Sequence, residues 1–376
     1  MNILKLIKRS IGREELPVRA GYWPEQAPER LKEGPETWRK LMEDPVICGA
    51  VDILILKTVG EGVRLAGRGE ICSFLTEMLK GFSVPFSEIL RQAMTALIYG
   101  SAVSEKVFGY RNGRFLIEDL KFKPRESYRF ALDNYNNIKG VVRPARTGEV
   151  IPREKLFIFT NKGDYGNPAG ASALAPCLPL WRMKREKMAE YCKYLSLYAS
   201  PALIGTLPPE AANIDKRGFL RDLSRLKSGG VMAVTSGVSV SPVSVQNNES
   251  MYLNFIDFCN REMTTAILGS TRATMEAKHG SKADSETSLS LVRDRIKFYR
   301  QNLAEAVKDQ LLFPIVEANF GRERAEAETP ACEFIPDDTE DLISYGNMVA
   351  NLCAKGFLDP SQKADIDPML KLPKRK

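Results

Sequence analysis

The chain has 376 residues, enough for two or three domains, and its 44% hydrophobic and 27% charged content is that of an ordinary globular protein. Its net charge of +7 permits contact with nucleic acid or an anionic surface, although solubility alone also accounts for it. Seven scattered cysteines, none in Cys-x-x-Cys spacing, indicate a reduced, intracellular protein. The single histidine, His279, excludes zinc sites built on several histidines, and any histidine-based catalytic triad must use it.

The N-terminal third predicts helices after an irregular start. Residues 1–20 form a basic amphipathic segment that is too interrupted by charge to be a secretory signal, and no stretch has the about 20 apolar residues of a membrane-spanning helix. Prolines in residues 14–36 predict an extended arm. Helical periodicity then predicts helices over 36–43, 45–58 and 69–79 and a further helix beginning near Ser83.

Residues 100–160 change to short alternating segments, which predict a mainly antiparallel β-region. The pair Asn112-Gly113 stands between two such segments and predicts a tight hairpin. The β-α-β rhythm of a doubly wound nucleotide-binding sheet is lacking, and so is the Gly-x-x-x-x-Gly-Lys-Ser/Thr run of a P-loop.

A glycine-rich turn at residues 161–170 precedes a long basic amphipathic helix, predicted over 172–199. Residues 200–247 read as a small unit of strands and one helix, and a second long helix is predicted over 251–268. Two long helices that flank a small module suggest a stalk with a tip and no enclosed pocket.

The remaining sequence predicts a polar loop over 269–288 and then a long helix over 289–319 that Pro314 should kink. An extended link and a last helix over 339–354 follow, and the C-terminal tail is basic.

The polar loop supports one alternative of another class. His279, Lys282, Asp284 and Glu286 lie within eight residues, and a metal-dependent nucleic-acid enzyme could use such a set, with the carboxylates holding magnesium. A loop that touches a DNA phosphate, or a merely solvated loop, fits the same residues. A third reading is a basic scaffold or membrane-surface adaptor that uses residues 1–13.

Several segments, in this order, resemble the portal proteins of tailed bacteriophages, and the subfamily resembled is that of the Mu-like portals. The turn Gly-Asn-Pro-Ala-Gly (166–170) leads to Trp181 and a basic run, and Leu-Tyr-Ala-Ser-Pro-Ala-Leu-Ile-Gly (197–205) opens the insert. The stretch 255–271 is followed by Gly-Ser-Lys-Ala-Asp-Ser-Glu (280–286). The resemblance covers roughly residues 40–355.

The resemblance implies an α+β portal fold with a mixed α/β wing, two long stem helices, a small α/β clip and a short helical crown. The implied parts are an N-terminal basic segment (1–20), the first part of the wing (21–165), stem helix 1 (166–199), the clip (200–247), stem helix 2 (248–268), a tunnel-loop region (269–288), a kinked helix with the wing return (289–336), and the crown helix with its basic tail (337–376).

The resemblance also implies a non-enzymatic protein without cofactor or metal, found at one vertex of a virion capsid and in the host cytoplasm during assembly. It would form a ring, usually of twelve copies, through which double-stranded DNA passes without sequence preference. The implied partners are the terminase large subunit, head-completion or adaptor proteins and the major capsid protein, with no membrane.

A sliding channel needs scattered basic side chains and no base-reading forks. The candidates for contact with DNA are Arg182, Arg185, Arg272, Lys278, His279 and Lys282. Pairing of the helix charges with Glu186 and Glu190 between subunits is an equally good reading. The candidates for the seam between copies are the apolar side chains Leu178, Trp181, Met188, Phe255 and Met263.

Overall fold

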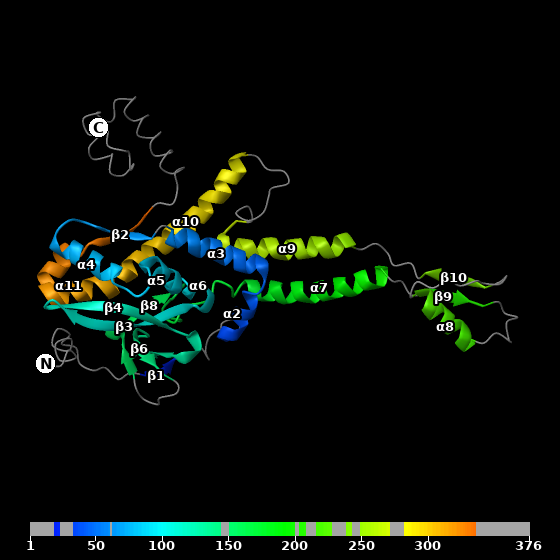
Figure 1. Ribbon diagram of the computed structural model, residues 1–376, viewed down its shortest axis with the longest axis horizontal. Helices are drawn as coiled ribbons and strands as arrows, with labels where there is room; N and C mark the ends of the chain where they lie inside the picture. Colours follow the sequence, from blue (N-terminus) through cyan, green and yellow to red (C-terminus); the bar gives the residue numbers. More distant parts are fainter. Residues whose placement is uncertain are drawn as a thin grey trace, which may run out of the picture. The chain divides into compact units, whose positions relative to one another are not determined.

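The computed structural model comprises two compact units (Figure 1). One unit, the body, consists of residues 1–175 and 267–376, and the other of residues 176–266. The structure describes residues 19–22, 33–60, 62–143, 150–199, 203–207, 216–227, 238–242, 249–270 and 282–335. The predicted strand near 231–235, the helix over 339–354, the C-terminal tail and most of the first 32 residues lie outside these ranges.

The body begins its described core with five helices, as the periodicity predicts. They are α2 (Pro35–Leu41), α3 (Pro45–Val59), α4 (Glu70–Lys80), α5 (Phe86–Ala93) and α6 (Ala96–Tyr99). Pro45 occupies the first turn of α3, where its missing N–H costs nothing, and the Asp44 carboxylate accepts a hydrogen bond from the Val46 amide at 3.0 Å. The single helix expected after Ser83 is observed as two helices. The first, α5, ends before Met94, and the second, α6, starts at Ala96.

Residues 101–160 are antiparallel β-structure, which confirms the sequence prediction. One sheet has the order β4-β3-β8, from β3 (Ser101–Arg111), β4 (Arg114–Lys123) and β8 (Leu156–Thr160). A second has the order β1-β5-β6-β7, from β1 (Arg19–Tyr22), β5 (Arg129–Leu132), β6 (Ile138–Val142) and β7 (Val150–Pro152). At the predicted hairpin, Asn112 and Gly113 have φ values of 51° and 80°, as the tight turn between β3 and β4 requires.

A buried cluster joins strands of both sheets. Phe130 and Val141 come from β5 and β6, and Val103, Leu156 and Ile158 come from β3 and β8. A further small sheet pairs β2 (Val63–Ala66) with β11 (Ala331–Phe334), the last described strand, and so joins the end of the described chain to its N-terminal part. Both segments that the resemblance assigns to the wing, 21–165 and 289–336, thus lie in the same compact unit.

The glycine-rich turn at 161–170 is a structural junction. The Asn161 amide donates to the Gly100 carbonyl at 2.8 Å, and the Asn161 side chain accepts from the Tyr299 hydroxyl at 3.0 Å. Gly170 has a φ of +77°, and a Cβ there would lie 2.2 Å from the Gly100 carbonyl oxygen. Only glycine fits at residue 170, because the backbone is left-handed and a second backbone touches it.

The long helix of the body is interrupted just before Pro314. It runs as α10 (Lys282–Val307), a π-helical segment η5 (Lys308–Leu312) and α11 (Phe313–Phe320), followed by α12 (Arg322–Glu328). Pro314 has no N–H for the Gln310 carbonyl, and the Lys106 ammonium donates to that carbonyl at 2.5 Å. The helix is thus irregular where Pro314 was predicted to kink it, and a buried lysine supplies a donor for the carbonyl that the proline leaves without one.

Two side-chain amides on this helix pair with the edge strands of the β4-β3-β8 sheet. Gln310 accepts from the Ile158 amide and donates to the Ile158 carbonyl of β8, both at 2.9 Å. Asn319 does the same with the amide and carbonyl of Phe115 on β4, both at 2.8 Å. Both edges of this sheet are thus capped from one helix.

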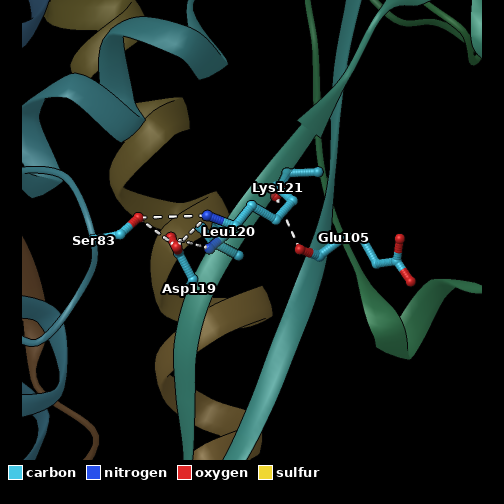
Figure 2. Close-up of polar contacts among 6 residues, drawn as sticks. Ser83, Glu105, Asp119, Leu120 and Lys121 are labelled. Atoms are coloured by element: carbon cyan, nitrogen blue, oxygen red, sulfur yellow. Dashed lines mark hydrogen bonds and ion pairs between the residues drawn. The ribbon is translucent and has the colours of Figure 1, made fainter.

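A polar cluster fixes the loop after α4 to β4 (Figure 2). The Asp119 carboxylate accepts from the Ser83 hydroxyl, from the Lys121 ammonium at 2.5 Å and from the Leu120 amide at 2.8 Å. Partial burial works to raise the pKa of Asp119, but the hydrogen bonds outweigh it and the pKa lies below its usual range. Glu105 on β3 separately pairs with Lys123 at 3.0 Å.

The 176–266 unit contains two long helices, α7 (Cys177–Ala199) and most of α9 (Glu249–Leu268). It also contains a small segment of β9 (Leu203–Thr206), α8 (Lys216–Lys227) and β10 (Ser239–Pro242), in which β9 and β10 pair antiparallel. The predicted helix start at 172 is wrong by five residues. The residue before a proline avoids the helical region, so Pro176 keeps Ala175 out of the helix, whereas Pro179 is tolerated in its first turn.

Candidate functional site: the paired helices α7 and α9

The helices α7 and α9 run antiparallel and side by side (Figure 1). At one end, the Cys177 thiol lies 3.7 Å from the Met263 carbonyl. At the other, the ring of Tyr252 lies 5.5 Å from that of Tyr191 and 5.7 Å from that of Tyr194. The Tyr191 hydroxyl also donates to Glu249 at 3.1 Å. These contacts define the inner side of each helix.

The middle of the inner side is polar in part. Lys184 of α7 is only 6% exposed, and Cys259 of α9 is fully buried. Burial raises the pKa of the Cys259 thiol, while the positive charge of Lys184 acts in the opposite direction. The helix that reads as simply basic in the sequence therefore keeps one of its lysines inside the pair.

Each helix also carries apolar side chains on its outside. The α7 stripe comprises Met188 and Leu195, 44% and 40% exposed, with the exposed Cys192 between them. The α9 stripe comprises Met251 and Phe258, 70% and 51% exposed, with the half-buried Phe255 between them. Solvent-facing apolar rows at helical spacing are typical of surfaces that bind another helix.

The two stripes face opposite sides of the helical pair. A helix turns by about 100° per residue. Counted in the direction in which the helix winds from N- to C-terminus, the α7 stripe lies about a quarter-turn ahead of the inner side marked by Lys184 and Tyr194. Counted in the same way along α9, the α9 stripe lies about a quarter-turn behind the inner side marked by Tyr252 and Cys259. Because the helices are antiparallel and their inner sides face each other, these opposite offsets point the stripes in opposite directions.

The charges of the two helices also differ in sign. α7 carries five basic and two acidic side chains, a net charge of +3. α9 carries one basic and three acidic side chains, a net charge of −2. The two helices are therefore opposite in net charge, and each carries an apolar stripe.

The residues predicted for the seam divide into two groups. Leu178 and Met263 are 5% and 0% exposed within the single chain, so they belong to its own core and a neighbouring copy cannot reach them. Met188 and Phe255 lie on the two stripes. Trp181 is half-buried beside the α7 stripe, with the Arg185 guanidinium 4.9 Å above its ring.

The residues predicted to contact DNA are only partly placed. Arg182 and Arg185 are exposed on α7. The alternative is that the basic residues of this helix pair with Glu186 and Glu190 of another subunit. Within one chain, Lys187 already pairs with Glu190 at 2.8 Å. Arg272, Lys278 and His279 lie outside the described residues, and Lys282 is the first residue of α10, with only its backbone described.

The predicted loop over 269–288 is shorter than expected, because α10 already begins at Lys282 and includes residues 284 and 286. The polar residues start a helix there, seven residues before the apolar periodicity begins. Within the described part of the chain, no group of three or more His, Cys, Asp or Glu side chains is placed to hold a metal ion. No helix there has the length and apolar character to cross a membrane.

A row of arginines on α8 was not predicted from the sequence. Arg217, Arg221 and Arg225 are all exposed and follow at intervals of four residues. The interval was visible in the sequence, but a basic amphipathic helix is ordinarily read as a solvated surface.

Solved structures share this fold. A chain of the structure titled "Virion of native gene transfer agent (GTA) particle" matches with a TM-score of 0.64 and 12% identity, covering 98% of each chain. A chain of "Neck of native GTA particle computed with C12 symmetry" matches with a TM-score of 0.64 and 14% identity, covering 90% of this chain and 94% of that one. These structures share the fold at low sequence identity, and the predicted α+β fold is confirmed.

The family follows from the sequence itself. The family model described as "Portal protein of Mu bacteriophage" matches residues 35–368, and the chain belongs to that family. The "Mu-like prophage FluMu protein gp29" of Haemophilus influenzae is 23% identical over 192 residues, which are 48% of this chain. This chain spans only 35% of that relative's length. The resemblance to Mu-like portals is confirmed.

Proposed function

We propose that copies of this chain form a closed ring at one vertex of a capsid, and that double-stranded DNA passes through the ring during packaging and ejection. The role is structural and non-enzymatic. The observation that most supports the ring is the pair of apolar stripes on opposite sides of the α7–α9 pair. A ring of identical subunits needs two different complementary surfaces, one on each side of every copy, and the stripes supply them.

Membership of the portal family supports the channel role. The C12 symmetry of the similar particle neck supports a ring of twelve. In this proposal residues 200–247 are the clip, which docks the terminase large subunit and later the head-completion or adaptor proteins, and the body contacts the major capsid protein. DNA slides because phosphates are held loosely and no base is read.

Cysteine cross-linking tests the ring contact directly. Tyr191 stacks on Tyr252, so Cys192 of α7 and Met251 of α9 lie at the same height along the pair. In a ring, Cys192 of one copy then faces residue 251 of the next. The Met251→Cys variant, mildly oxidised, should give a ladder of covalent oligomers on a non-reducing gel, and Phe255→Cys covers an offset of one helical turn.

Two controls separate this contact from random oxidation. Adding Cys192→Ser to the Met251→Cys variant should abolish the ladder. Leu253→Cys should give none, because Leu253 is exposed but lies on the side of α9 away from the α9 stripe. Equal ladders from the 251 and 253 variants, or only monomers in native mass spectrometry of the wild type, would refute the proposal.

A further inference from the structure

The three arginines of α8 form one exposed row along the helix. Arg217, Arg221 and Arg225 are separated by four residues, so each follows the last by about 6 Å along the helix with about 40° of rotation. All three are exposed. Arg225 is 75% exposed, and its guanidinium lies 3.9 Å from the exposed Asp222 carboxylate. The helix as a whole carries five basic side chains and one acidic one, a net charge of +4.

The opposite side of α8 is fixed to the small sheet. Leu223 is 8% exposed, and a Cβ added at Gly205 of β9 would lie 2.3 Å from the Phe219 ring and 2.9 Å from Leu223. Phe219 and Leu223 each lie about 160° around the helix from the centre of the arginine row, one on either side of the direction opposite to it. Packing on β9 therefore turns the three guanidinium groups directly away from the sheet.

The composition of the row favours a phosphate backbone over a protein. Its immediate flanks are Gly218 and Ser224, which are small and let a broad surface approach closely. Protein interfaces usually have an apolar core, whereas the nearest apolar side chain, Leu220, lies on one shoulder of the row. A duplex carries one charge per about 3.4 Å along each strand, so a row about 12 Å long matches about three or four successive phosphates of one strand.

We propose that Arg217, Arg221 and Arg225 bind the sugar-phosphate backbone of double-stranded DNA, independently of sequence. This inference rests on the proposed function and adds a second DNA-contact site, in the clip, to the basic residues of α7. Three arginines per copy, repeated around a ring, give the duplex many equivalent weak contacts.

Binding of the full-length protein to a fluorescent duplex of random sequence, followed by anisotropy at several NaCl concentrations, tests the inference. The variant carrying Arg217→Gln, Arg221→Gln and Arg225→Gln should bind more weakly. The slope of log K against log [NaCl] should become shallower by about 1 for each arginine in contact, up to about 3 for each engaged copy.

Two matched variants control for charge and shape. Replacing Arg64, Arg111 and Arg322 by Gln removes the same net charge from exposed positions of the body and should leave the slope nearly unchanged. Replacing the three α8 arginines by Lys should retain the slope, because phosphate neutralisation needs charge and no particular fork.

The outcomes are distinct from those for the ring. If the Gln variant forms rings and keeps the wild-type slope, the inference is overturned while the proposed function stands. If it instead loses binding of a poly-glutamate peptide and keeps that of DNA, the row docks an acidic protein and the inference is again overturned. Absence of rings in the wild type refutes the proposed function itself.

Discussion

The body and the 176–266 unit bury their apolar side chains differently. Among the described residues, eight of the fifteen exposed large hydrophobic side chains lie in the 176–266 unit, which is about a quarter of the chain. In the body, the sheets and helices enclose residues such as Phe130, Phe157 and Leu311 within one chain. The difference teaches that the body buries its apolar side chains within one chain, whereas the helical pair leaves apolar surface exposed, as the proposed contact between copies requires.

The largest expected effect is on assembly. Phe258→Asp places a charge on the α9 stripe, and the seam between copies should fail at every subunit, so native mass spectrometry and negative-stain images should show monomers or open forms. Because Phe258 is 51% exposed, the free energy of unfolding of the chain should fall by only about 1 kcal/mol.

Phe258→Leu is the conservative control and should keep the rings, since it preserves an apolar side chain. Rings of the Asp variant that resemble those of the wild type would remove the α9 stripe from the interface.

The next effect concerns the body alone. Gly170→Ala should lower the free energy of unfolding by about 3 kcal/mol or more, because the residue is left-handed and its Cβ would overlap the Gly100 carbonyl. Gly49→Ala, in the interior of α3 with no atom within 4 Å of the added Cβ, should raise it by about 0.5–1 kcal/mol. Chemical denaturation measures both, and a neutral result at Gly170 would show that the junction is not rigid.

The smallest effect is a pH dependence of the body. Burial lowers the pKa of Lys106 from its usual value to about 8, although Glu154 acts against the shift. The unfolded chain then holds more protons than the folded one between pH 8 and about 10.5, so stability rises with pH across this window. Relative to Lys106→Met, the wild type should gain about 2 kcal/mol of unfolding free energy from pH 7 to pH 10.

Denaturation of both proteins at the two pH values checks this sign, because other titrating groups cancel in the difference. A wild type that loses stability relative to Lys106→Met as the pH rises would contradict the assigned burial of the ammonium.

Local chemistry made much of the fold predictable. The hairpin at Asn112-Gly113 and the first turn of α3 at Pro45 depend on residues that are neighbours in the sequence, and both were predicted correctly. The start of α7 was misplaced because apolar periodicity begins before Pro176. The role of Lys106 could not be predicted, since its partner carbonyl, on Gln310, lies 204 residues away.

The site was predictable only in outline. Periodicity identified α7 and α9, but it could not separate apolar residues that face the partner helix from those that face outward. Met263 and Phe255 are both apolar and at helical spacing, yet one is buried and the other lies on the α9 stripe. The separation depends on which side of α9 meets Cys177 and the tyrosines of α7, which only the tertiary structure provides.

Gln310 and Asn319 have a consequence for the proposed assembly of many copies. An open strand edge offers its backbone groups to any similar edge nearby, and a crowd of identical subunits is where such mispairing would begin. The side-chain amides of Gln310 and Asn319 already bond the backbone N–H and C=O of Ile158 and Phe115. At these two positions the β4-β3-β8 sheet therefore has no free backbone group to pair with a strand of another copy. Neighbours are thereby guided to meet through side chains, and sheet-to-sheet fusion into fibres is discouraged.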